Sequence, residues 1–152
     1  MFRFNLNLFA FVLAFTQLLA IVAAPIDAGQ INVYQTSEEC FANQRILMDD
    51  LNNAAETMMR VYLRFDKPAV VNVMDNIGGA IKQLDSISRV ARFGGKVDPQ
   101  VTEDLVTLAR NARAHLDEVN GVPDVKTAHE VTSAVWTMQD ALSMAQAVAY
   151  AC

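Results

Sequence analysis

Apolar residues recur every three or four positions in four separate stretches of the chain, with polar residues between them. This spacing lines up the apolar side chains on one face of an α-helix. The pattern predicts helices over 37–65 and 67–93, a third from Asp98 to Asn120, and a fourth from Asp124 to the end of the chain. No stretch alternates apolar and polar residues for long enough to predict a strand. The four stripes are Leu47, Leu51, Ala54, Met58, Val61 and Phe65; Val70, Met74, Ile77, Ile81, Leu84, Ile87 and Ala91; Val101, Leu105, Leu108, Ala112, Leu116 and Val119; and Ala128, Val131, Val135, Met138, Leu142, Ala145 and Ala149.

Polar residues suited to capping a helix precede each stretch. Thr36 and Glu39 have the spacing of a capping box, in which each side chain accepts a hydrogen bond from the backbone N–H of the other residue. Asp66, Asp98 and Asp124 can accept hydrogen bonds from the unpaired amides in the first turns of the later helices. These residues set the expected start of each helix.

The expected connections between helices are short and contain glycine. Gly94–Gly95 follows the second helix and Asn120–Gly121 the third, and glycine accepts the left-handed conformation that ends a helix. Helices joined by short connections pack as antiparallel neighbours, which brings the start of the first helix and the end of the last to the same end of a bundle. Cys40 and Cys152 lie at these two places, and two cysteines of a small domain pair in an oxidising compartment. We therefore predict an all-α, up-down-up-down antiparallel four-helix bundle over 36–152, closed by a Cys40–Cys152 disulfide.

The N-terminal segment has a different composition. Arg3 is its only charged residue up to residue 24, and an almost wholly apolar run is followed by small residues. These features predict a cleaved signal peptide over 1–24, with the cleavage site left open between Ala23 and Gly29. The apolar run of about 16 residues is short for a membrane anchor, which needs roughly 20. Residues 25–35 show no helical period, so we expect an extended N-terminal arm there. The prediction is a secreted, extracellular protein with no stable membrane anchor, and association with a cell wall is left open.

Charge narrows the range of partners. Without Arg3, the chain keeps 11 of its 12 Lys and Arg residues and all 17 Asp and Glu residues, a net charge of −6. Nucleic-acid binding needs a surplus of basic residues to neutralise phosphates, so we expect no nucleic-acid partner. An acidic domain also lacks the polybasic attraction to anionic membranes.

Five residues are candidates for facing a ligand. Met58, Met74 and Met138 could line an adaptable apolar pocket, because methionine is flexible and fills irregular spaces. Gly78 and Gly79 interrupt the second helix, where they either permit close packing or a kink or leave a gap that faces a ligand. A plain core would use the same residues, so a filled and a hollow bundle both stay open.

Few residues could carry catalysis or bind a metal. His115 and His129 flank the last connection and are weak candidates for a metal site, because no third ligand is matched to them; solvated histidines are the simpler interpretation. Both cysteines are assigned to the disulfide, and no two carboxylates share an evident apolar pocket, as acid–base catalysis would need. We expect no enzyme activity, no cofactor and no resident metal. Trp136 lies beside Val135 of the fourth stripe, so we expect it to be half buried.

Three features carry a family resemblance: a phenylalanine-rich signal, the Ala24–Pro25 dipeptide and the Leu-x-x-Leu-type spacing between Val101 and Val119. In these the chain resembles small secreted fungal helical proteins of the hydrophobic-surface-binding and cell-wall galactomannoprotein type. The resemblance implies binding of an apolar ligand or surface and assigns no functional residue. The group is typically rich in Ser, Thr and Ala and does not depend on a bridge such as Cys40–Cys152, and this chain departs from it on both counts.

Two functional hypotheses follow. The first is a secreted non-enzymatic bundle that binds an apolar small molecule or a hydrophobic surface. The second is an extracellular protein–protein interaction module, such as an effector or an enzyme inhibitor, by analogy of fold alone. A filled interior would favour the second hypothesis.

Overall fold

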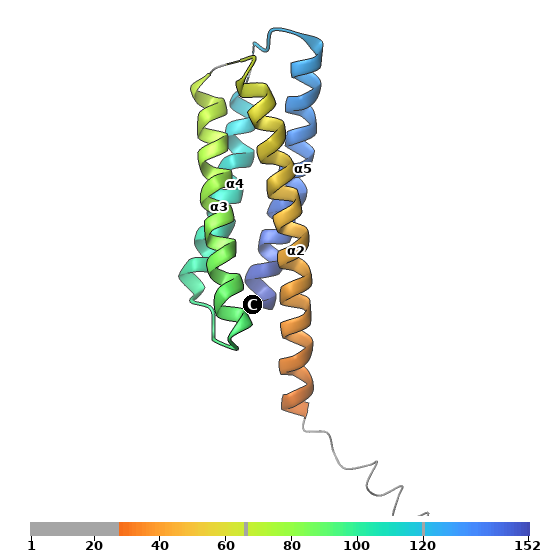
Figure 1. Cartoon of the computed structure of the whole chain (residues 1–152), viewed down its shortest axis with the longest axis vertical. Helices are drawn as coiled ribbons and strands as arrows, with labels where there is room; N and C mark the ends of the chain where they lie inside the picture. The colour runs from red at the N-terminus through yellow and green to blue at the C-terminus, as the bar shows by residue number, and fades with distance from the viewer. Residues whose placement is uncertain (1–27, 66, 120) are drawn as a thin grey trace, which may run out of the picture. The chain divides into compact units, whose positions relative to one another are not determined.

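The computed structural model describes residues 28–65, 67–119 and 121–152, with side chains from Glu38 onward. Four helices make up most of this part of the chain, and it contains no strand. The predicted signal peptide and residues 25–27 lie outside the described residues. The helices are α2 (Ala28–Tyr62), α3 (Pro68–Arg92), α4 (Pro99–Glu118) and α5 (Val125–Ala151), as Figure 1 shows.

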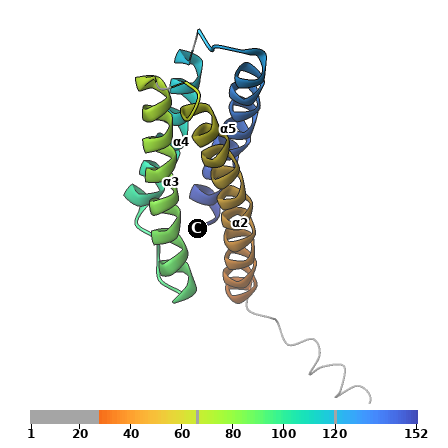
Figure 2. The same ribbon diagram turned by 45° about the horizontal axis from the view of Figure 1, so that its top comes forward.

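Residues Thr36–Cys152 form one compact unit. Within it, successive helices run antiparallel, and both views show α2 beside α3 on one side and beside α5 on the other (Figures 1 and 2). Helix α4 packs against α3 and α5. The order around the bundle is therefore α2, α3, α4, α5, which confirms the predicted up-down-up-down four-helix fold.

The core is made of apolar side chains from all four helices. Every member of the first predicted stripe is buried. In the later helices some members of the predicted stripe are buried, and others are replaced in the core by an adjacent residue: Val73 and Ala80 are buried, whereas Met74 and Ile81 are half-buried. In α4 and α5 the innermost positions are again held by small residues: Ala109, Ala112, Ala134, Ala141 and Ala145.

Side-chain size explains why one of two adjacent apolar residues is buried and the other is half-buried. A small residue on the bundle axis lets helices approach closely, and the larger neighbour then covers the gap between two helices. Leu108 and Leu142 are half-buried in this way, each next to a buried alanine. The period of the pattern predicts the helices correctly, and packing decides which of two adjacent apolar residues points inward.

Helix caps follow the sequence at four of the predicted points. The Asp98 side chain accepts a hydrogen bond from the backbone N–H of Gln100, and Asp124 accepts one from Thr127. Gly94 and Gly121 adopt left-handed φ angles of 67° and 65° after α3 and α4. Non-glycine side chains rarely adopt this conformation, so these glycines close the helices as predicted.

The limits of α2 differ from the prediction. The helix begins at Ala28 and runs through Thr36, so the capping box at Thr36 and the extended conformation expected over 28–35 are both wrong. Extending an existing helix adds a hydrogen bond for each residue without a new nucleation step, and no proline interrupts this segment. At its other end α2 stops at Tyr62, and Phe65 N–H donates to the Val61 carbonyl in the turn that follows.

The start of α3 also differs from the expected cap. Lys67 is the N-cap residue and makes no side-chain capping hydrogen bond, and Pro68 follows it in the first turn. Asp66, the predicted cap, lies outside the described residues. None of the helices in the described part of the chain combines the length and the apolarity needed to cross a bilayer.

Candidate functional site

The interior holds the residues that were candidates for facing a ligand. Met58 and Met138 are fully buried in the core cluster, and Met74 packs against it. A Cβ built on Gly79 would lie 3.1 Å from Leu108 Cδ2, so this glycine permits the close approach of α3 and α4. A Cβ on Gly78 would meet nothing within 4 Å. Three surface pockets, beside Gln44, Met59 and Val106, have linings that include none of these five residues.

The two histidines do not form a metal site with neighbouring residues. His115 Nδ1 lies 3.0 Å from Glu118 Oε2 at the end of α4, and His129 is exposed on α5. Across the described residues there is no group of three or more His, Cys, Asp or Glu side chains placed to hold a metal ion. Both histidines therefore have the arrangement of ordinary surface residues.

The disulfide end of the bundle contains a buried polar contact that the sequence analysis missed. Cys40 and Cys152 are bonded at an S–S distance of 2.10 Å, which joins α2 to the residue after α5. Gln44 is 4% exposed, and its Nε2 donates to Cys40 Sγ at 2.9 Å and to Cys152 Sγ at 3.4 Å. Its Oε1 accepts a hydrogen bond from Ser88 Oγ of α3 at 2.5 Å.

Gln44 therefore links three helices through one side chain. The other buried polar residues of the described chain, Thr102 and Thr127, bond only within their own first turns. A signal for Gln44 was present in the sequence, because it lies four residues after Cys40 and three before Leu47, on the line of the first stripe. A polar residue on a buried stripe needs a partner, since an unpaired buried amide is costly.

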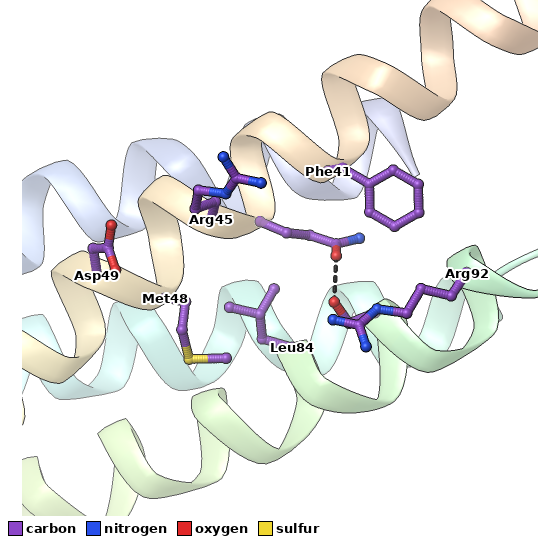
Figure 3. A pocket seen from close by; sticks show the side chains of 8 residues that line it. Phe41, Arg45, Met48, Asp49, Leu84 and Arg92 are labelled. Carbon is purple, nitrogen blue, oxygen red and sulfur yellow. Dashed lines mark hydrogen bonds between the residues drawn. The ribbon is translucent and has the colours of Figure 1, made fainter.

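A groove of about 400 Å³ lies between α2 and α3, beside the contact between Gln44 and Ser88. Its apolar part consists of Phe41, Met48 and the buried Leu84, and Arg45 and Asp49 stand on the α2 side. Figure 3 shows Phe41 and Arg92 at one end of the groove and Met48 and Asp49 at the other. Gln44 and Ser88 complete the lining.

The outer face of α5 is the second surface of interest. Trp136 is 69% exposed, Val125 87% and Tyr150 95%. Trp136 was expected to be half buried, and this expectation is wrong. It lies two residues from both Ala134 and Met138, which are buried, and a step of two residues turns a helix by about 200°. Trp136 therefore points away from the core.

Charge is scarce on this face. From Val131 to Cys152, Asp140 is the only charged residue. The exposed positions around the aromatic side chains are mostly uncharged polar residues: Thr132, Ser133, Gln139, Ser143 and Gln146. We call this surface, with Trp136 and Tyr150, the α5 face.

Two carboxyl groups have shifted pKa values. Burial raises the pKa of Asp50 on α2, and the charges of Asp140 and Asp49 raise it further. The backbone N–H and hydroxyl of Thr127 lower the pKa of Asp124 by hydrogen bonding to its charged form. Neither group lines the groove.

No protein-family model, no curated protein and no solved structure matches this chain. The likeness to fungal surface-binding proteins stays a prediction.

Proposed function

We propose that this protein is an extracellular, non-enzymatic helical bundle that binds another protein through the α5 face. The exposure of Trp136 on a charge-poor face is the observation that carries the proposal. Tryptophan and tyrosine are enriched at the energetic centres of protein interfaces, and charged residues are depleted there.

The packing of the interior supports this choice over a ligand held inside the bundle. Met58 and Met138 are fully buried among core side chains, and Gly79 accommodates Leu108. This packing favours binding at the surface over binding inside the bundle. Tryptophan is enriched among the residues that anchor such binding surfaces.

The disulfide supports the extracellular location. Structural disulfides persist in oxidising compartments and are rare in the cytosol. The Cys40–Cys152 bond is buried at its Cys40 side and contacted by Gln44, as expected of a structural bond. Together with the predicted signal peptide, it favours secretion.

Site-specific photo-crosslinking tests the partner. A benzophenone amino acid at position 136, incubated with the culture medium of the producing organism, should give a discrete adduct with one protein. The same group at Thr107, an exposed residue of α4, should not give that adduct. Adducts of equal yield at both positions would contradict the proposal.

The identified partner then allows a direct measurement. Trp136→Gln should weaken its binding by about 30-fold or more, which is the scale of an interface hot spot, and leave the melting temperature within about 2 °C because the side chain is exposed. Binding that survives this substitution would contradict the assignment. Trp136-dependent adsorption to hydrophobic beads, with no protein partner, would instead support the hydrophobic-surface hypothesis.

A further inference from the structure

The groove between α2 and α3 has a composition that the α5 face lacks: an apolar wall with cationic side chains at its rim. Phe41, Met48 and Leu84 form the wall, and Arg45 and Arg92 come from opposite sides of the groove. Its volume of about 400 Å³ falls in the range of sites for small organic ligands. Asp49 is the only acidic residue in the lining.

The floor of the groove is fixed in place. The Gln44 amide nitrogen donates to the two sulfurs, which lie on the same side of it, and the amide oxygen accepts from Ser88. Gln44 is 4% exposed and cannot turn toward a ligand without losing these contacts. The floor therefore fixes the shape of the groove. The arginines at the rim are the partners available to a charged group of a ligand.

The arginines supply that partner. Neither Arg45 nor Arg92 forms a salt bridge with another described residue. Arg92 stands in the last turn of α3, where a positive charge is expected from the helix dipole. Arg45 lies inside α2, far from either end, so the dipole does not account for it.

We propose that this groove binds a small organic anion with an apolar body, namely a carboxylate or sulfonate on an aromatic or short aliphatic group. The anionic group pairs with Arg92, at the end of the groove away from Asp49 (Figure 3). The apolar body lies against Phe41, Met48 and Leu84. The guanidinium fork binds two oxygens of such a group at once, which a neutral ligand cannot match. This ligand site is on different helices from the α5 face and is independent of the protein partner proposed there.

An NMR titration of the ¹⁵N-labelled, disulfide-closed protein with naphthalene-2-sulfonate tests the site. We expect saturable shifts of the backbone amides of Phe41, Met48, Ser88 and Arg92. The neutral analogue naphthalene-2-methanol should bind at least about tenfold more weakly, because it lacks the charge-assisted hydrogen bonds. Equal affinity for both probes, shifts centred on Trp136, or no saturation at 10 mM would each overturn the proposal.

Matched variants locate the charge. Arg92→Gln should weaken sulfonate binding about fivefold and Arg45→Gln about twofold, since exposed ion pairs are modest. Lys82→Gln, an exposed basic residue of α3 outside the groove, should have no effect. Phe41→Ala should weaken the binding of both probes by the same factor, because it removes part of the apolar wall and leaves the arginines unchanged. If Lys82→Gln weakened sulfonate binding as much as Arg92→Gln, the attraction would come from net charge alone, and the proposed ligand site would be refuted.

Discussion

At one end of the bundle, a disulfide and a buried glutamine join α2, α3 and α5. At the opposite end, α2 and the turn after it meet α5 through charged side chains: Arg64 Nη1 lies 2.6 Å from Glu130 Oε2, and Arg60 Nε lies 3.8 Å from Glu130 Oε1. The first end relies on a covalent bond and on groups withdrawn from water. The second relies on charges that water and salt can reach. The comparison teaches that the two ends should respond to different perturbations, and four predictions test this.

The largest effect should come from opening the disulfide. The double variant Cys40→Ala, Cys152→Ala removes a link between residues 112 positions apart, for which loop-entropy models give a loss of about 4–5 kcal/mol. The melting temperature should then fall by well over 10 °C, as thermal circular dichroism can measure. Reductant should give the same fall in the wild type and none in the variant. An unchanged melt would show that the covalent end contributes little.

Placing a charge at Gln44 should be the next most damaging change. Gln44→Glu keeps the size of the side chain but removes two N–H donors and adds a buried carboxylate, at a cost of about 3 kcal/mol at neutral pH. Urea denaturation should show this loss, and it should shrink as the pH falls and the carboxyl is protonated. Gln44→Leu serves as the control and should cost about 1 kcal/mol or less, because it leaves no unpaired buried amide. Equal losses for the two variants would mean that the hydrogen bonds to sulfur and Ser88 are incidental.

Removing the charge at the other end should have a smaller effect. Glu130→Gln should lower the free energy of unfolding by about 1 kcal/mol, because both arginines are a third or more exposed and the pairs are screened. The loss should diminish at 1 M salt, where screening acts within about 3 Å. Glu103→Gln, an exposed residue of α4 with no salt bridge among the described residues, is the matched control. A loss that does not change with salt would contradict the electrostatic account.

The smallest effects should appear in the pH dependence of stability. The pKa of Asp50 is raised above its ordinary value of 3.8, so its contribution favours the fold at low pH and is lost as the pH rises through the folded pKa. Asp50→Asn should therefore stabilise the protein at neutral pH, by about 0.5 kcal/mol at most. Asp124 has the opposite sign: its lowered pKa stabilises the fold above pH 3.8, and this is lost as the pH falls.

Urea denaturation between pH 2.5 and 7 separates these two groups. Asp124→Asn keeps a capping side chain but should remove part of the stability lost below pH 4. The difference in the free energy of unfolding between Asp50→Asn and the wild type should become smaller as the pH falls. An Asp50→Asn variant less stable than the wild type at pH 7 would show that the carboxylate is favourably placed.

Helix positions and the disulfide could be predicted from the sequence because they depend on local and robust signals. Asp98, Gly94 and Gly121 act on the backbone beside them, and the antiparallel order leaves Cys40 and Cys152 at one end. The start of α2 could not be predicted in this way. A capping residue at Thr36 competes with simple continuation of the helix, and continuation wins.

The candidate site was less accessible to sequence reasoning. Whether Met58 and Met138 fill a core or line a cavity depends on packing between helices, which periodicity does not contain. Predicting the groove requires the relative positions of Phe41 on α2 and Arg92 on α3 along the bundle axis, which the sequence does not give. The exposure of Trp136 follows once Ala134 and Met138 are known to be buried, but the predicted stripe placed Val135 in the core in place of Ala134.

The disulfide also determines what a protease can achieve. Each connection between helices, at 63–67, 93–98 and 119–124, falls between Cys40 and Cys152 in the sequence. A single cut in any of them leaves both fragments attached through the sulfurs, with every helix still covalently held in the molecule. In the extracellular location proposed above, where proteases are abundant, a nicked copy would keep its helices together until the bond itself is reduced.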